Sequence, residues 1–145
     1  MKHRTNKKNK LMITAAIAPM TGWADVDEYY EKFKDVNPDD VNEVKQIINE
    51  YFLPYFKKHY TLEGVIKIKE VLGYFLSTDD SVDWQREFDG SLMPFDSPKN
   101  PKLFFVWLWE ELFPDEDYQS YTISDVQVVE SYKDYQKIFK VKKQQ

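Results

Sequence analysis

Residues 103–118 read Leu103-Phe104-Phe105-Val106-Trp107-Leu108-Trp109-Glu110-Glu111-Leu112-Phe113-Pro114-Asp115-Glu116-Asp117-Tyr118. Seven bulky apolar residues run directly into a segment that holds five carboxylates and no cation. A helix that is apolar almost all round belongs in the centre of a core. We therefore expect the most buried helix at about residues 101–113, ended by Pro114. The carboxylates that follow should form an exposed edge beside this core.

Two helices are predicted before residue 60. Asp25 followed by Glu28 has the spacing of a capping box, so a short helix should begin at Asp25. Asn37 and Pro38 supply an N-cap and a proline at the first helical position of a longer, amphipathic helix. Pro54 lies inside this second pattern and should kink or end the helix near residue 53.

Two more helices are predicted between residues 61 and 90. Thr61 can cap a helix in which Gly64 and Gly73 indicate close packing of another element. A short helix from about residue 82 should stop at Gly90. The apolar stripe of the longer of these helices consists of Leu62, Val65, Ile68, Leu72 and Phe75.

The C-terminal part has a different character, because residues 121–129 are rich in β-branched side chains and residues 139–142 alternate apolar with Lys. This pattern favours a β-hairpin that turns near Lys133 and Asp134. A last helix starting at Ser124 is the alternative. The expected fold class is therefore mainly α, or α+β: a single-domain bundle of about five helices with a small C-terminal β-hairpin.

The first 24 residues raise a separate question. Five Lys or Arg in residues 1–10 precede a short apolar stretch at residues 11–18, which is the outline of a signal peptide. A basic tail followed by an N-terminal strand, or a start codon read upstream of Met12, are the alternatives. We expect residues 25–145 to form one globular domain in the cytoplasm, or in the periplasm if residues 1–24 are a signal peptide.

Charge is distributed unevenly along the chain. The formal net charge is −5, but nine of the 20 Lys and Arg lie in residues 1–10 and 137–145, so the segment between carries about −14. Such a field repels nucleic acid and attracts basic proteins. No stretch approaches the roughly 20 apolar residues that a membrane span needs. We expect a basic protein partner, with no direct binding to nucleic acid or membrane; the oligomeric state stays open.

The residues that usually carry catalysis are scarce. The chain has no Cys, and its two His are His3 in the basic tail and His59 beside two lysines. Glu110 and Glu111 diverge by about 100° on a helix and do not converge on one substrate. Asp115 and Asp117 alternate as in a calcium loop, but Ser120 replaces the required Gly. We expect no enzyme activity, no cofactor and no metal site.

Two acidic clusters with aromatic neighbours are the candidate partner-binding residues. Phe104 and Trp107 are predicted to be core, whereas the three aromatic residues of the clusters should reach the surface and anchor a partner. The sequence alone does not decide whether the two clusters lie on the same face of the molecule. Their members are Asp79, Asp80, Asp83, Trp84 and Glu87 in the first, and Trp109, Glu110, Glu111, Asp115, Glu116, Asp117 and Tyr118 in the second.

The chain has an acidic body at residues 25–117 and an acidic, aromatic edge from Trp109 to Tyr118. In this overall character it resembles bacterial toxin immunity proteins. The resemblance implies a non-enzymatic protein-binding module that neutralises a cognate toxin, commonly a nuclease whose Lys- and Arg-lined groove is covered by carboxylates. The basic termini depart from this picture. The alternatives are a nucleic-acid-mimicking inhibitor or adaptor, and an exported domain of another role.

Overall fold

The chain is mainly helical. The computed structural model describes residues 6–9, 11–78, 82–121 and 126–129. In chain order its elements are β1 (Asn6–Asn9), α1 (Leu11–Ile17), η1 (Ala18–Met20), η2 (Trp23–Asp25), α2 (Asp27–Phe33), α3 (Val41–Ile47), the π-helical turn η3 (Ile48–Phe52), α4 (Leu53–His59), α5 (Leu62–Thr78), α6 (Trp84–Asp89), α7 (Lys102–Leu112), η4 (Tyr118–Tyr121) and β2 (Val126–Val129).

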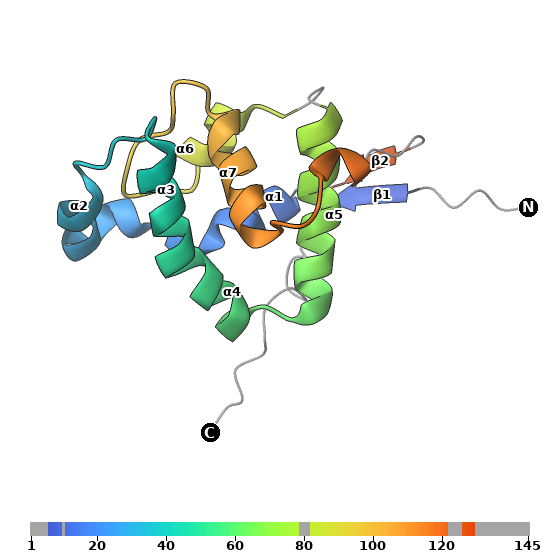
Figure 1. Ribbon diagram of the computed structural model, residues 1–145, viewed down its shortest axis with the longest axis horizontal. Helices are drawn as coiled ribbons and strands as arrows, with labels where there is room; N and C mark the ends of the chain where they lie inside the picture. Colours follow the sequence, from blue (N-terminus) through green and yellow to red (C-terminus); the bar gives the residue numbers. More distant parts are fainter. Residues whose placement is uncertain (1–5, 10, 79–81, 122–125, 130–145) are drawn as a thin grey trace, which may run out of the picture.

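Helix α7 lies in the middle of the helical body (Figure 1), as its apolar sequence predicted. It packs against α3 on one side and α5 on the other, and α1 packs against α5 and α6. Helix α2 lies at the far end of the molecule from α5. No helix among the described residues combines the length and apolarity that crossing a bilayer demands.

The Phe104 side chain is fully buried in this core and joins segments that are distant in sequence. Its ring lies 6.1 Å from Phe52 of η3, 5.1 Å from Phe88 of α6 and 6.1 Å from Phe95 in the loop before α7, measured between ring centroids. Edge-to-face and tilted aromatic contacts of this kind add to the free energy gained by burial. Phe104 therefore fixes the position of α7 relative to α6 and η3.

The starts of two helices differ from the predictions. Asp40, not Asn37, caps α3, because its Oδ1 accepts the backbone N–H groups of Asn42 and Glu43. The side chain of Asn37 instead accepts the N–H of Asp39 and forms a local turn. Helix α2 begins after Val26 without a side-chain cap, so the capping box predicted at Asp25 does not form.

Pro54 does not end the second predicted helix. The chain continues from α3 to α4 through the π-helical turn η3, in which the N–H of Leu53 donates to the carbonyl of Ile48. Proline has no N–H, and its ring clashes with the carbonyl four residues earlier in a regular α-helix. A wider turn just before Pro54 accommodates the ring, as π-turns inside helices can do.

The next helices agree with the sequence in most respects. The Oγ1 of Thr61 accepts the N–H of Gly64 at 2.9 Å and caps α5, as predicted. Gly64 and Gly73 are both buried in the packed face of α5, and α6 ends at Gly90. Leu62 is the exception within the predicted apolar stripe, because 78% of its surface is exposed.

The predicted C-terminal β-hairpin is not supported. Residues Val126–Val129 do form a strand, but this strand pairs in parallel with β1, with Asn6 opposite Val126. The alternative helix from Ser124 is also wrong at these four residues. The expected turn at Lys133 and Asp134 lies outside the described residues. Parallel strands need a long crossover connection, and here the whole helical body supplies it.

Helix α1 and the turn after it belong to the core. The side chains of Ile13, Ile17 and Met20 are fully buried. The hydroxyl of Tyr60, at the end of α4, donates to the carbonyl of Ala15 at 2.6 Å. Removal of residues 1–24 would therefore take these apolar side chains out of the core.

Phe104→Ala should lower the free energy of unfolding by about 3–5 kcal/mol, because it removes a fully buried ring and leaves a cavity. Leu103→Ala is the matched control, since Leu103 is adjacent on α7 and 38% exposed. Chemical denaturation followed by circular dichroism measures both variants. Equal losses for the two variants would contradict the role of Phe104 in the core.

Tyr60→Phe should lower the free energy of unfolding by about 1–2 kcal/mol, because it removes the hydroxyl that bonds the carbonyl of Ala15 inside the protein. Tyr30→Phe, at a tyrosine that is 49% exposed, should stay within about 0.5 kcal/mol of the parent. The same denaturation experiment measures this difference, and a Tyr60→Phe variant as stable as Tyr30→Phe would show that the bond to α1 contributes nothing.

Candidate functional site

The carboxylates of the second predicted cluster lie at and beyond the C-terminal end of α7. We call Glu110, Glu111, Asp115, Glu116 and Asp117 the α7 acidic end. Glu111 is partly buried and the other four are exposed. The N–H of Phe113 donates to the carbonyl of Trp109 and that of Glu116 to the carbonyl of Phe113, so the chain turns sharply after the helix.

Two lysines from neighbouring helices compensate part of this charge. Lys45 of α3 lies 3.5 Å from Glu110 and 3.9 Å from Glu111, measured from its Nζ to the nearest carboxylate oxygen. Lys69 of α5 lies 2.9 Å from Glu116. Within the described ranges, five carboxylates against two lysines leave three negative charges uncompensated. In the part of the chain that the structure describes, Asp115 and Asp117 form no ion pair.

Hydrogen bonds also hold the acidic end in place. The Nδ2 of Asn49 donates to Glu111 at 2.7 Å, and Asp117 accepts the N–H of Gln119 at 2.9 Å. The hydroxyl of Ser77 on α5 donates to the carbonyl of Tyr118 at 2.8 Å. The acidic end is therefore connected to η3 through Asn49 and to α5 through Ser77.

Trp109 is not the surface anchor that the sequence predicted. It is 1% exposed, and its Nε1–H donates to the carbonyl of Glu116 at 2.8 Å. Tyr118, which is half-buried, meets the Trp109 ring edge-on at 6.3 Å. Because the chain folds back after Pro114, Tyr118 at the start of η4 lies against Trp109, and the Trp109 indole holds the acidic loop from inside.

The first predicted cluster has a different setting. Asp79 and Asp80 lie outside the described residues. Asp83 is exposed and caps α6 by accepting the N–H of Arg86 at 3.1 Å. Glu87 is partly buried and accepts a hydrogen bond from Thr14 of α1 at 3.4 Å. These acids therefore stabilise α6 and its contact with α1.

Trp84 is also buried, contrary to the prediction that it reaches the surface. It is 7% exposed, and its ring lies 4.8 Å from that of Phe105 on α7. Its Nε1–H has no hydrogen-bond partner among the described residues. Trp84 packs α6 onto α7 and offers no exposed aromatic surface to a partner.

Glu110 of the second cluster lies on the side of α7 that faces away from α6. Helix α6 contacts Phe104 and Phe105 of α7 through Phe88 and Trp84. Around the helix axis, residue 110 lies about 120° from residue 104 and about 140° from residue 105. Trp84 and Glu110 are therefore on different sides of α7.

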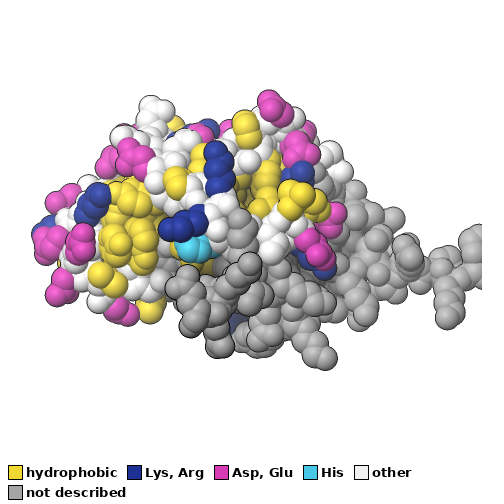
Figure 2. Space-filling model, turned by 90° about the horizontal axis from the view of Figure 1, so that it is seen from below, with side chains coloured by type: hydrophobic (Ala, Val, Ile, Leu, Met, Phe, Trp, Pro, Cys, Tyr) yellow, Lys and Arg dark blue, Asp and Glu magenta, His cyan; other side chains and the backbone are white. Residues whose placement is uncertain are grey.

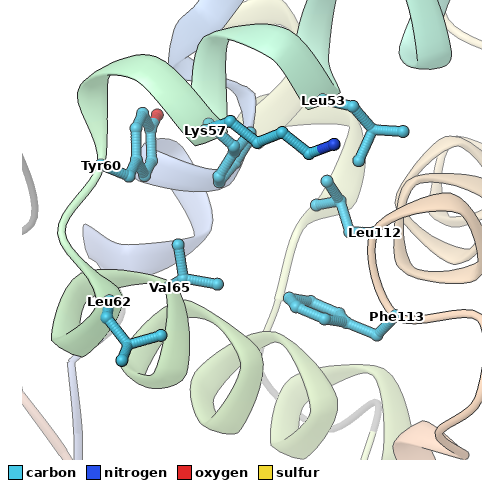
Figure 3. Close-up of a pocket in the computed structure, with 8 residues that line it drawn as sticks. Leu53, Lys57, Tyr60, Leu62, Val65, Leu112 and Phe113 are labelled. Atoms are coloured by element: carbon cyan, nitrogen blue, oxygen red, sulfur yellow. The ribbon is translucent and has the colours of Figure 1, made fainter.

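Sequence reasoning missed an apolar groove beside the acidic end. Its volume is about 510 Å³, and α4, α5 and the end of α7 form its walls (Figure 3). Val65 of α5 lies across the gap from Leu112 and Phe113, and the Lys57 side chain extends along the α4 side. The lining consists of Leu53, Phe56, Lys57, Tyr60, Leu62, Val65, Leu112 and Phe113.

The periodic spacing of the apolar residues of α5 does not distinguish those that line the groove from those that are buried. Leu62 and Val65 have the same spacing as the buried residues that follow them, so the sequence predicts core for all of them. In the structure Leu62 lies beyond the packed part of α5. Seen from below, apolar side chains are exposed beside lysine, histidine and acidic side chains (Figure 2).

A second acidic surface surrounds α2. Trp23 stacks on Tyr29 with ring centroids 3.8 Å apart, and the Nζ of Lys32 lies 4.8 Å from the centre of the Tyr51 ring. The hydrogen bond to Tyr51 raises the pKa of Lys32 above its usual value. The exposed carboxylates of this surface are Asp25, Asp27, Glu28, Glu31 and Asp35.

The acidic residues that the structure describes do not gather as metal ligands. Among the described residues, no group of three or more His, Asp or Glu side chains lies close enough together to hold an ion. In the stretch that resembles half a calcium loop, Asp117 uses its carboxylate to accept the N–H of Gln119. The arrangement is suited to presenting charge at the surface.

Known proteins provide no further guide to this site. Comparison of the chain with models of protein families, with curated proteins and with solved structures finds no significant match. Its function must therefore be inferred from the acidic end of α7 and the groove beside it.

Proposed function

We propose that this protein is a non-enzymatic binding module that neutralises a basic protein, most simply a cognate bacterial toxin, as immunity proteins do. The observation that carries the proposal is the pair Asp115 and Asp117. Both are exposed and outside any ion pair with a described residue, and both lie in a loop that Trp109 fixes to the core.

Fixing the loop that carries these carboxylates before binding favours association with a cationic surface. A charged group that is already ordered loses little conformational entropy when its partner arrives. The exposed carboxylates of Asp115 and Asp117 raise the encounter rate with a basic partner, and this effect weakens as salt screens the field. The apolar groove beside them offers surface that a partner can bury.

The nucleic-acid-mimicking alternative receives less support. A mimic needs carboxylates in an extended row on one face, because nucleic acid carries its phosphates at regular intervals. Glu110 lies on the side of α7 that faces away from α6, and Glu110, Glu111 and Glu116 are paired with lysines. A compact acidic patch for one protein partner fits these positions better.

The proposal places the protein in the cytoplasm, with the periplasm as the alternative if residues 1–24 are removed as a signal peptide.

A genetic experiment tests the function. Expression of the gene directly upstream should stop growth of a host cell, and co-expression of this chain should restore growth. Growth inhibition that is equal with and without this chain, or no inhibition at all, would overturn the proposal.

The double variant Asp115→Asn with Asp117→Asn should slow association with the basic partner by about three- to tenfold at low salt, since it removes two exposed charges. The amide that replaces the carboxylate at position 117 keeps an oxygen that accepts the N–H of Gln119, so the fold should be unchanged. Stopped-flow kinetics at two salt concentrations measures the effect.

A matched control removes the same charge elsewhere. Asp35→Asn with Asp96→Asn changes two exposed carboxylates outside the α7 acidic end and should slow association less. The difference between the two double variants should disappear at about 1 M salt, where the screening length is about 3 Å. Equal effects of the two double variants at low salt would show that net charge acts without the α7 acidic end.

A further inference from the structure

We propose that the groove between α4, α5 and the end of α7 binds a fatty acid, whose acyl chain lies against the apolar walls and whose carboxylate meets the ammonium group of Lys57. This inference goes beyond the proposed function, because it concerns a small ligand and not the basic partner. It follows from the chemistry of the groove lining and from the direction of the one charged side chain among the described residues that form it.

The groove is apolar and large enough for an acyl chain. Its volume of about 510 Å³ lies within the range of about 300–1,000 Å³ found for ligand sites. Seven of the eight described lining side chains are aliphatic or aromatic. Leu62 forms part of the wall and is 78% exposed, so a ligand there covers apolar surface that water would otherwise contact. Apolar surface gathered around a hollow marks a binding site more often than scattered apolar residues do.

The walls offer few hydrogen-bonding groups to a ligand. Lys57 and Tyr60 carry the polar side-chain atoms of the described lining, and the Tyr60 hydroxyl already donates to the carbonyl of Ala15 at 2.6 Å. Backbone groups inside α4 and α5 are bonded along each helix. A peptide or sugar would lose many hydrogen bonds to water here without replacing them, which costs free energy. The ligand that fits is therefore apolar along its length and polar at one end.

Lys57 defines the charge of that polar end. Its side chain extends along α4, and its amine points toward Leu53 and Leu112 (Figure 3). An ammonium group has three donors, and its hydrogen bonds to a carboxylate are stronger than those between neutral groups. The aliphatic part of the lysine side chain can also lie against an acyl chain. A carboxylate at the end of an acyl chain is complementary to this arrangement.

A second cation lies on the Phe113 side of the groove. The Nζ of Lys69 is 5.6 Å from the centre of the Phe113 ring and 2.9 Å from Glu116. This lysine compensates a carboxylate of the α7 acidic end, so the acidic end repels an anion in the groove less than its sequence suggests. We place the carboxylate of the ligand at Lys57 and the acyl chain along Val65 toward Leu62.

Titration of the full-length chain with laurate tests the inference. Isothermal titration calorimetry, below the concentration at which laurate forms micelles, should show saturable binding of one laurate per chain. Decanoate and octanoate should bind more weakly, by about two- to fourfold for each methylene removed, because each methylene buries apolar surface. Affinity that does not change with chain length would show that the carboxylate binds to surface lysines alone and would overturn the inference.

A pair of lysine variants tests the position of the carboxylate. Lys57→Met removes the charge and keeps an unbranched side chain, and it should weaken laurate binding by about two- to fivefold. Lys58→Met is the matched control, at an adjacent exposed lysine outside the described lining, and should leave the affinity unchanged. Equal affinities of the two variants for laurate would overturn the role of Lys57.

Reversal of the charge gives a second test of the same contact. The parent chain should bind laurate more tightly than dodecylamine, which has the same length and a cationic head. Lys57→Glu should bind dodecylamine more tightly than laurate, because the carboxylate now attracts the ammonium group. A parent chain that prefers dodecylamine would show that the groove does not recognise an anion.

The apolar wall is tested by two leucine variants. Leu62→Glu should weaken laurate binding by about tenfold or more, because it places a charge in the wall. Leu92→Glu is the matched substitution, at a leucine that is 51% exposed and outside the groove, and should leave the affinity unchanged. Should Leu62→Glu fail to fold, the chain-length series and the lysine variants still decide. No saturable laurate binding by the parent chain, or equal binding by the two glutamate variants, would overturn the inference.

The laurate experiment and the growth experiment fail independently. Laurate binding that depends on Lys57 and Leu62, together with no protection against the upstream gene product, supports the fatty-acid site and rejects the immunity function. Protection without laurate binding supports the immunity function and rejects the fatty-acid site.

Discussion

Burial of the Phe104 ring is the constraint on which the rest of the structure depends. Phe52, Phe88 and Phe95 come from three separate parts of the chain and all pack against it. Because α7 is apolar on nearly every side, its neighbours must surround it. Charged side chains of this segment can reach solvent only where the helix emerges from the core. The position of the acidic end is therefore a consequence of how α7 is buried.

Charged and apolar surfaces lie side by side at this end of α7 for two reasons. The first concerns Trp109, and the second concerns Leu112 and Phe113. Trp109 must be covered, and the returning chain covers it while its carbonyl at Glu116 accepts the indole N–H. Leu112 and Phe113 belong to the last turn, where α4 and α5 leave a gap. Lys45 and Lys69 hold the inner carboxylates, so the outermost ones face solvent.

The sequence predicted some features that depend on local pattern, although the helix caps expected at Asp25 and Asn37 are wrong. The all-apolar run indicated the central helix, and the hydroxyl of Thr61 indicated the start of α5. Features that depend on distant segments were missed: the covering of Trp109 by the returning chain, and the parallel partner of Val126–Val129. The groove was missed because Leu62 has the spacing of a buried residue, and periodicity does not show where the neighbouring helix ends.

The pairing of β1 with β2 has a consequence for synthesis of the chain. Asn6 pairs with Val126, a separation of 120 positions. At a translation rate of roughly 5–20 residues per second, β2 is synthesised on the order of ten seconds after β1. During that interval the backbone donors and acceptors of β1 are open to any other strand. The sheet can close only after translation has produced the whole helical body, so it forms among the last contacts of the nascent polypeptide.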